Sequence, residues 1–135
     1  MQKLKFYRIG DPLYKQNFTL CIGAAPAAKK YFSKVYNIQA PKAGQDAICV
    51  TLERGEESRS FIWVKGPNMG SLAHECLHRA IEVLDYCGVK LYPHNDEPLT
   101  YYFSYIFEQC YEVLYSSYKK EKTEKKNNEA RKSKN

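Results

Sequence analysis

The sequence predicts an α+β fold in which helices pack against a small antiparallel sheet. Apolar residues alternate with a period of two at several places before residue 66, and they recur every three or four residues after residue 71. The expected order is one strand, a helix, two strands and two helices. A chain of 135 residues is long enough for one ordinary domain and too short for two.

The first predicted strand and helix lie between residues 17 and 37. Residues 17–23 (NFTLCIG) alternate apolar and polar side chains and end at a glycine, which is typical of a half-buried strand. In residues 24–37 the apolar side chains are spaced by three or four, and Pro26 stands in the first turn, where a helix tolerates proline. This segment is therefore expected to form a short helix.

A hairpin and two helices are expected to follow. Residues 46–53 and 60–65 are rich in β-forming side chains and flank a polar segment that contains a glycine, which favours an antiparallel pair. An apolar stripe that starts after Ser71, the expected N-cap, and ends before Gly88 predicts a long helix. The last helix is expected to begin near Glu97.

Residues 1–118 form the expected domain, and residues 119–135 form a basic tail. Ala130 is the only hydrophobic residue of the tail, so ordering it would bury almost no apolar area. We therefore expect the tail to be disordered, or at most a fraying helical extension. The tail holds 8 Lys and Arg against 3 Glu, which leaves 13 Lys and Arg against 12 Asp and Glu in the domain.

Charge and composition restrict the class of protein. Because the excess positive charge lies in the tail, we do not expect the domain to bind nucleic acid. The alternative to a tail that only aids solubility is weak contact of the tail with RNA or DNA. No apolar run approaches the length of a membrane span, and residues 1–10 lack the apolar core of a secretory signal, so we expect a cytoplasmic protein without a membrane partner. The five cysteines include no CxxC pair, which supports neither a disulfide framework nor a four-cysteine zinc site.

The long predicted helix carries the motif His74-Glu75-Cys76-Leu77-His78, an HExxH. Histidines four residues apart lie about 40° apart around a helix, so both imidazoles project from one side and can bind one tetrahedral zinc ion. Glu75 is offset from them and is placed to hydrogen-bond a water held by the metal. Both histidines lie off the apolar stripe, which favours a zinc site over the alternative of a purely structural histidine pair.

A catalytic zinc site needs a third protein ligand, for which His94 and the carboxylates of residues 95–98 are candidates. Residues 88–95 form a loop long enough to let the next helix begin beside the motif. Both candidates are geometrically allowed. We prefer Glu97, because a ligand in the first turn of a helix is better fixed than one on a loop and because its negative charge suits the helix N-terminus.

The segments AHECLH, DYCGV and NDEPLTYY together resemble the small "minimal zincin" metallopeptidase-like proteins of bacteriophage genomes, and HExxH followed by a helix-opening Glu is similar to the Glu-zincins. The resemblance covers residues 60–110. For a phage-encoded protein it implies a location in the host cytoplasm. It also implies the roles of the site residues: His74, His78 and Glu97 as zinc ligands, Glu75 as the general base, and Tyr101 as the tyrosine that follows the ligand Glu.

The expected function is zinc-dependent hydrolysis of a peptide or protein. Zinc with three protein ligands keeps a position for water, and Glu75 takes a proton from that water as it attacks a carbonyl and later passes it to the leaving amine. Tyr101 and His94 are candidates either for donors to the oxyanion or for surface residues beside the site. The alternative function is a catalytically idle module in which zinc staples two helices and a strand edge captures a partner peptide. The sequence leaves the oligomeric state open.

The hairpin formed by residues 46–65 is expected to hold the substrate. Its second strand leads into the turn at 66–68 that delivers the motif helix, so this strand is expected to lie close to the metal. In zincins an edge strand beside the active-site helix binds an extended peptide by main-chain hydrogen bonds, and the resemblance implies the same use of an edge here. The alternative is an edge that charged side chains protect against aggregation.

Overall fold

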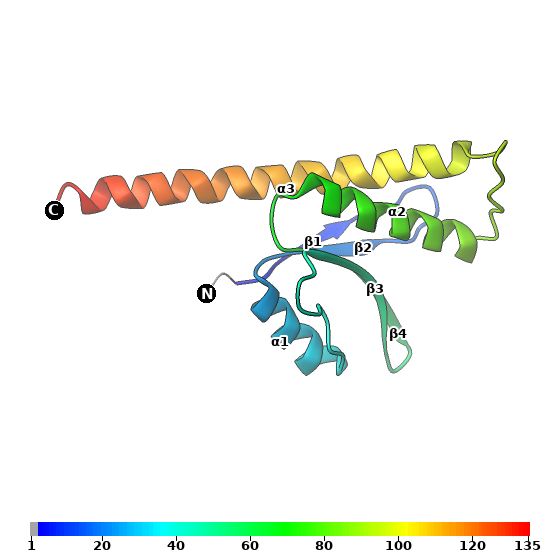
Figure 1. The fold of residues 1–135 in the computed structure, drawn as a ribbon, viewed down its shortest axis with the longest axis horizontal. Helices are drawn as coiled ribbons and strands as arrows, with labels where there is room; N and C mark the ends of the chain where they lie inside the picture. The colour runs from blue at the N-terminus through cyan, green and yellow to red at the C-terminus, as the bar shows by residue number, and fades with distance from the viewer. Residues whose placement is uncertain (1–2) are drawn as a thin grey trace.

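The computed structural model describes residues 3–135 and confirms the α+β fold (Figure 1). The four strands form one sheet in the order β1-β2-β4-β3. One helix, α1, covers one face of the sheet, and α2 and α3 cover the other (Figure 1). The elements in chain order are β1 (Lys5–Ile9), β2 (Phe18–Ile22), α1 (Ala25–Tyr36), β3 (Ala47–Arg54), β4 (Glu57–Val64), α2 (Met69–Tyr86) and α3 (Glu97–Lys132).

The sheet is mixed, whereas the sequence predicted an antiparallel one. The predicted hairpin of β3 and β4 is present, and β1 and β2 also pair in antiparallel fashion, but the two pairs meet where β2 and β4 run parallel. The connection from β2 to β4 contains α1 and β3, which is long enough to return the chain for a parallel partner. As a consequence β1 and β3 are the two edge strands.

The central strands β2 and β4 are buried on both faces of the sheet. This explains why both sequences contain consecutive apolar residues in place of a strict alternation. On β4, Ile62 and Val64 belong to the core beneath α2 and α3, and Phe61 and Trp63 belong to the core beneath α1. The indole N–H of Trp63 donates to the carbonyl of Gly23 at 3.0 Å.

The strand β1 was not predicted from the sequence. Its residues, KFYRI, do not alternate cleanly, because each face of the sheet takes an aromatic side chain from it. The ring of Phe6 lies against Tyr31 of α1, with 4.9 Å between ring centroids, whereas the hydroxyl of Tyr7 donates to Ser117 of α3. An edge strand of this kind escapes a search for a period of two.

The helix α2 begins at Met69, two residues before its predicted N-cap. The side chain of Asn68, and not that of Ser71, caps the helix by accepting a hydrogen bond from the backbone N–H of Ser71 at 3.0 Å. Gly88 follows the helix with a φ of 75°, the left-handed conformation expected of a residue that ends a helix.

The helix α3 continues to Lys132, so the basic segment from residue 119 is a helical extension, where disorder was the first expectation. Lys and Glu are good helix formers, which favours continuation of a helix already anchored by its first half. Glu121 forms an ion pair with Lys5 at 2.9 Å, and the rest of the extension is exposed and projects beyond the body (Figure 1). None of the helices in residues 3–135 combines the length and apolar character that a membrane crossing requires.

Candidate metal centre

The HExxH motif lies in the first half of α2, next to the segment that leads into β3. His74 and Glu75 line an open groove of about 420 Å³ together with residues 44–47 and the first turn of α2. Both histidines are exposed, and Glu75 is half-buried. One expected zinc ligand, His74, and the expected general base, Glu75, are therefore accessible from one groove.

The two imidazoles converge on each other. The Nε2 atoms of His74 and His78 are 3.0 Å apart, and the ring centroids are 4.7 Å apart. Two nitrogens that each lie about 2.1 Å from one zinc ion at a tetrahedral angle are about 3.4 Å apart. The pair thus has nearly the spacing that a shared zinc requires, while the same distance suits a hydrogen bond between a protonated and an unprotonated nitrogen.

Glu97 is not brought to the histidine pair. The thiol of Cys76, inside the motif, shares a hydrogen bond with Cys110 of α3, which together with burial raises the pKa of Cys110. Glu97 precedes Cys110 by 13 residues, which corresponds to about 20 Å along α3. Cys76 also lies two residues from each histidine, so both imidazoles point about 160° away from the side of α2 that packs against α3.

The other expected residues at the start of α3 also lie away from the histidines. Tyr101 is 73% exposed, and the ring of His94 stacks on Tyr92 in the loop before α3, with 5.8 Å between centroids. Within residues 3–135 no three His, Cys, Asp or Glu side chains are arranged as a metal-binding group. The structure therefore brings together two expected ligands and the expected base, without Glu97 or Tyr101.

One further carboxylate lines the same groove. Asp46 lies just before β3, is paired with Lys65 at 3.7 Å, and borders the groove together with His74 and Glu75. No motif in the sequence points to it, because it precedes His74 by 28 residues and comes near only because β3 lies along α2.

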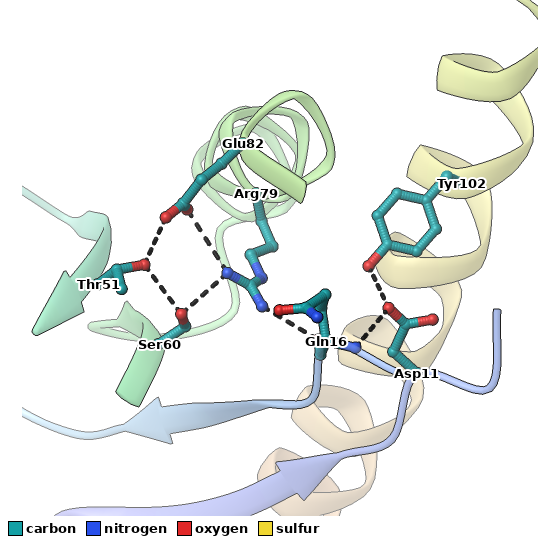
Figure 2. A network of polar contacts seen from close by, with 7 residues as sticks. All are labelled: Asp11, Gln16, Thr51, Ser60, Arg79, Glu82 and Tyr102. Atoms are coloured by element: carbon teal, nitrogen blue, oxygen red, sulfur yellow. Dashed lines mark hydrogen bonds and ion pairs between the residues drawn. The ribbon is translucent and has the colours of Figure 1, made fainter. Parts of the chain in front are cut away.

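The rotation of α2 about its axis is fixed by Arg79, the residue after His78 (Figure 2). Arg79 is 4% exposed, and its guanidinium donates to the hydroxyl of Ser60 at 2.9 Å and to the carbonyl of Gln16 at 3.0 Å. The carboxylate of Glu82 lies 3.6 Å from the guanidinium and also accepts a hydrogen bond from Thr51 of β3. These contacts hold α2 on the sheet with the histidines turned outward.

A second polar cluster ties the loop between β1 and β2 to α3. Asp11 accepts hydrogen bonds from the backbone N–H groups of Leu13, Tyr14 and Gln16 and, at 2.8 Å, from the hydroxyl of Tyr102 (Figure 2). Burial raises the pKa of the Asp11 carboxyl, but these donors outweigh burial and hold the pKa below its ordinary value of 3.8. Burial, followed by the bond to Asp11, raises the pKa of Tyr102. The Asp11 carboxylate and the Tyr102 hydroxyl therefore hold the loop whose Gln16 carbonyl accepts a hydrogen bond from Arg79.

The predicted hairpin does provide an edge strand, but it is β3. The second strand of the hairpin, β4, was expected to lie close to the metal and is internal to the sheet, between β2 and β3. β3 pairs only with β4, and no other strand of the described residues pairs with its outer side. The segment that enters β3 lines the same groove as His74.

Comparison of the chain with models of known protein families finds no match, and searches of curated proteins and of solved structures find none either. The resemblance to minimal zincins thus depends on the motif residues themselves.

Proposed function

We propose that the protein is a zinc-dependent hydrolase, a metallopeptidase in which His74 and His78 hold the metal and Glu75 is the general base. The observation that carries this proposal is the 3.0 Å separation of the two Nε2 atoms, beside a groove that Glu75 also lines. Zinc, when bound, supplies a Lewis acid that polarises a water or a carbonyl oxygen.

Each residue of the site has a separate task. His74 and His78 offer imidazole nitrogens from one side of a helix whose rotation Arg79 fixes. Glu75 is placed in the groove wall to take a proton from an attacking water and to pass it to a leaving amine. The unpaired edge of β3 offers backbone N–H and C=O groups to an extended chain, so a peptide is the substrate that suits this groove.

The third ligand distinguishes two forms of the proposal. The resemblance assigns it to Glu97, which lies about 20 Å along α3 from the level of the motif and would reach the metal only if the first turns of α3 moved. The groove offers Asp46 instead, which lines the groove together with His74 and would have to leave its ion pair with Lys65. Either carboxylate would complete the His₂-carboxylate donor set of a catalytic zinc site.

Zinc content tests the proposal directly. Protein purified without a histidine tag is expected to hold about one zinc per chain, and His74→Ala and His78→Ala are expected to lose it. Whichever of the variants Glu97→Ala and Asp46→Ala loses zinc identifies the third ligand. The matched control is His94→Ala, which changes a histidine on the loop before α3. Wild-type protein that takes up no zinc, and whose melting temperature zinc does not raise, would refute the proposal.

Catalysis is tested separately from metal binding. Glu75→Gln keeps the shape of the side chain and removes its basicity, so it is expected to retain zinc and to lose hydrolysis of an extended peptide. Hydrolysis that persists in Glu75→Gln would contradict the assigned role of Glu75.

A second candidate is a module that captures a peptide at the β3 edge without cleaving it. It is favoured by the observation that the described residues bring only two of the three expected ligands together. A zinc staple between α2 and α3 is not part of this candidate, because the histidines point away from α3. Equal binding of an extended peptide by the wild type and by Glu75→Gln, with no cleavage by either protein, would support this second function.

A further inference from the structure

The opposite edge of the sheet, formed by β1, carries a groove that plays no part in the proposed metal site. This β1–α1 groove lies between β1 and α1 and holds about 460 Å³. Its apolar lining comes from both elements and consists of Leu4, Phe6, Ala27, Tyr31 and Val35. Three exposed lysines complete it: Lys3, Lys30 and Lys34.

The two segments that form this groove carry positive charge and no negative charge. Residues 3–9 and 25–36 contain six Lys and Arg and no Asp or Glu. The rest of residues 1–118 carries seven Lys and Arg against 12 Asp and Glu. Three of the six, Lys3, Lys30 and Lys34, line the groove itself, and no acidic side chain of residues 3–135 does, so a ligand of complementary charge is acidic.

The outer edge of β1 is available for pairing. β2 occupies one side of β1, and no strand within residues 3–135 pairs with the other side. Natural edge strands are often protected by a charged side chain that points over the edge. Here Lys5 lies on the α3 face, where it binds Glu121, and Phe6 is 44% exposed on the groove side.

We propose that the β1–α1 groove binds an acidic, extended segment of another protein, which adds to β1 as a fifth strand. Main-chain hydrogen bonds to the free edge of β1 hold the segment, and an apolar side chain fills the space beside Phe6 and Tyr31. Asp or Glu residues of the segment face Lys30 and Lys34, and this pairing of opposite charges makes the groove selective for acidic segments. The site lies at the opposite edge of the sheet from β3, so it is independent of the metal centre.

The test uses the full chain and fluorescent peptides about ten residues long in which Val alternates with Glu, with Lys in place of Glu as the reversed-charge control. Fluorescence anisotropy is expected to show binding of the Glu peptide and none of the Lys peptide. Lys30→Glu and Lys34→Glu are each expected to weaken binding about fivefold. Lys29→Glu makes the same charge change on α1 outside the groove and is expected to weaken binding less than about twofold.

Strand addition has its own control. N-methylation of every second peptide amide removes donors from one side of the strand, so one of the two possible sets is expected to abolish binding and the other to leave it unchanged. Equal binding of both N-methylated sets would overturn strand addition. Equal effects of Lys29→Glu and Lys30→Glu, or binding to vesicles of anionic lipid without binding to the Glu peptide, would overturn the proposed partner.

Discussion

Removing the hydroxyl of Tyr102 is expected to destabilise the protein by an amount that can be worked out from the structure. Tyr102 is 1% exposed and Asp11 is 4% exposed, and their hydrogen bond measures 2.8 Å. A hydrogen bond to a charged group contributes about 1.5–3 kcal/mol. Asp11 keeps three backbone donors in Tyr102→Phe, so we expect a loss near the lower limit, about 1.5 kcal/mol.

This loss corresponds to a fall in melting temperature of about 5 °C, since the entropy of unfolding is about 2.1 cal/mol/K per residue for a chain of this length. Thermal and urea unfolding at about pH 7 measure it. Tyr105→Phe is the matched control, because Tyr105 lies on the same helix and donates to the carbonyl of Gly10 at 3.2 Å near the surface. We expect Tyr105→Phe to cost less than about 0.5 kcal/mol, and equal losses in the two variants would refute the assignment.

The effect of Tyr102→Phe depends on pH in a direction set by Asp11. The pKa of Asp11 in the folded protein is held below 3.8, so its carboxylate stabilises the fold above that pH and loses this contribution as the pH falls through the folded pKa. Tyr102→Phe raises the folded pKa towards the unfolded value, because one donor to the carboxylate is gone. The stability difference between wild type and variant should therefore shrink in acid, and a difference that persists undiminished at about pH 2 would refute the role of the carboxylate.

Two further predictions concern the extension and the cysteines. Truncation after Tyr118 removes one partly exposed ion pair and two exposed contacts of lysines with tyrosine rings, so the melting temperature is expected to change by less than about 2 °C by calorimetry. Any affinity for RNA or DNA, which salt should weaken steeply in the full chain, should disappear with the same truncation. Cys87 is exposed, so iodoacetamide is expected to label the folded protein at Cys87 alone by mass spectrometry, and early labelling of a second cysteine would contradict the fold. The other four thiols are shielded: Cys21, Cys49, Cys76 and Cys110. Burial raises the pKa of Cys21 and of Cys49 to about 12, which lowers their reactivity further.

The sequence by itself determined the parts of the protein that depend on neighbouring residues. The hairpin of β3 and β4 is marked by two β-forming runs around a polar loop, and α2 is marked by one apolar stripe. The spacing of His74 and His78 alone places both imidazoles on one side of α2, because four residues are close to one helical turn. The same local reasoning placed Glu75 beside them.

Only the tertiary structure decided the relations between distant segments. β2 pairs in parallel with β4 across a connection that contains α1 and β3, and this pairing leaves β1 at an edge of the sheet. No short window of sequence records such a pairing. The position of Glu97 depends on the level at which α3 packs against α2, and the contact of Cys76 with Cys110 shows that level. Asp46 lies in the groove because β3, which it precedes, packs along α2. Helical periodicity acts over one turn, whereas packing of the core determines which turns of different helices and strands meet.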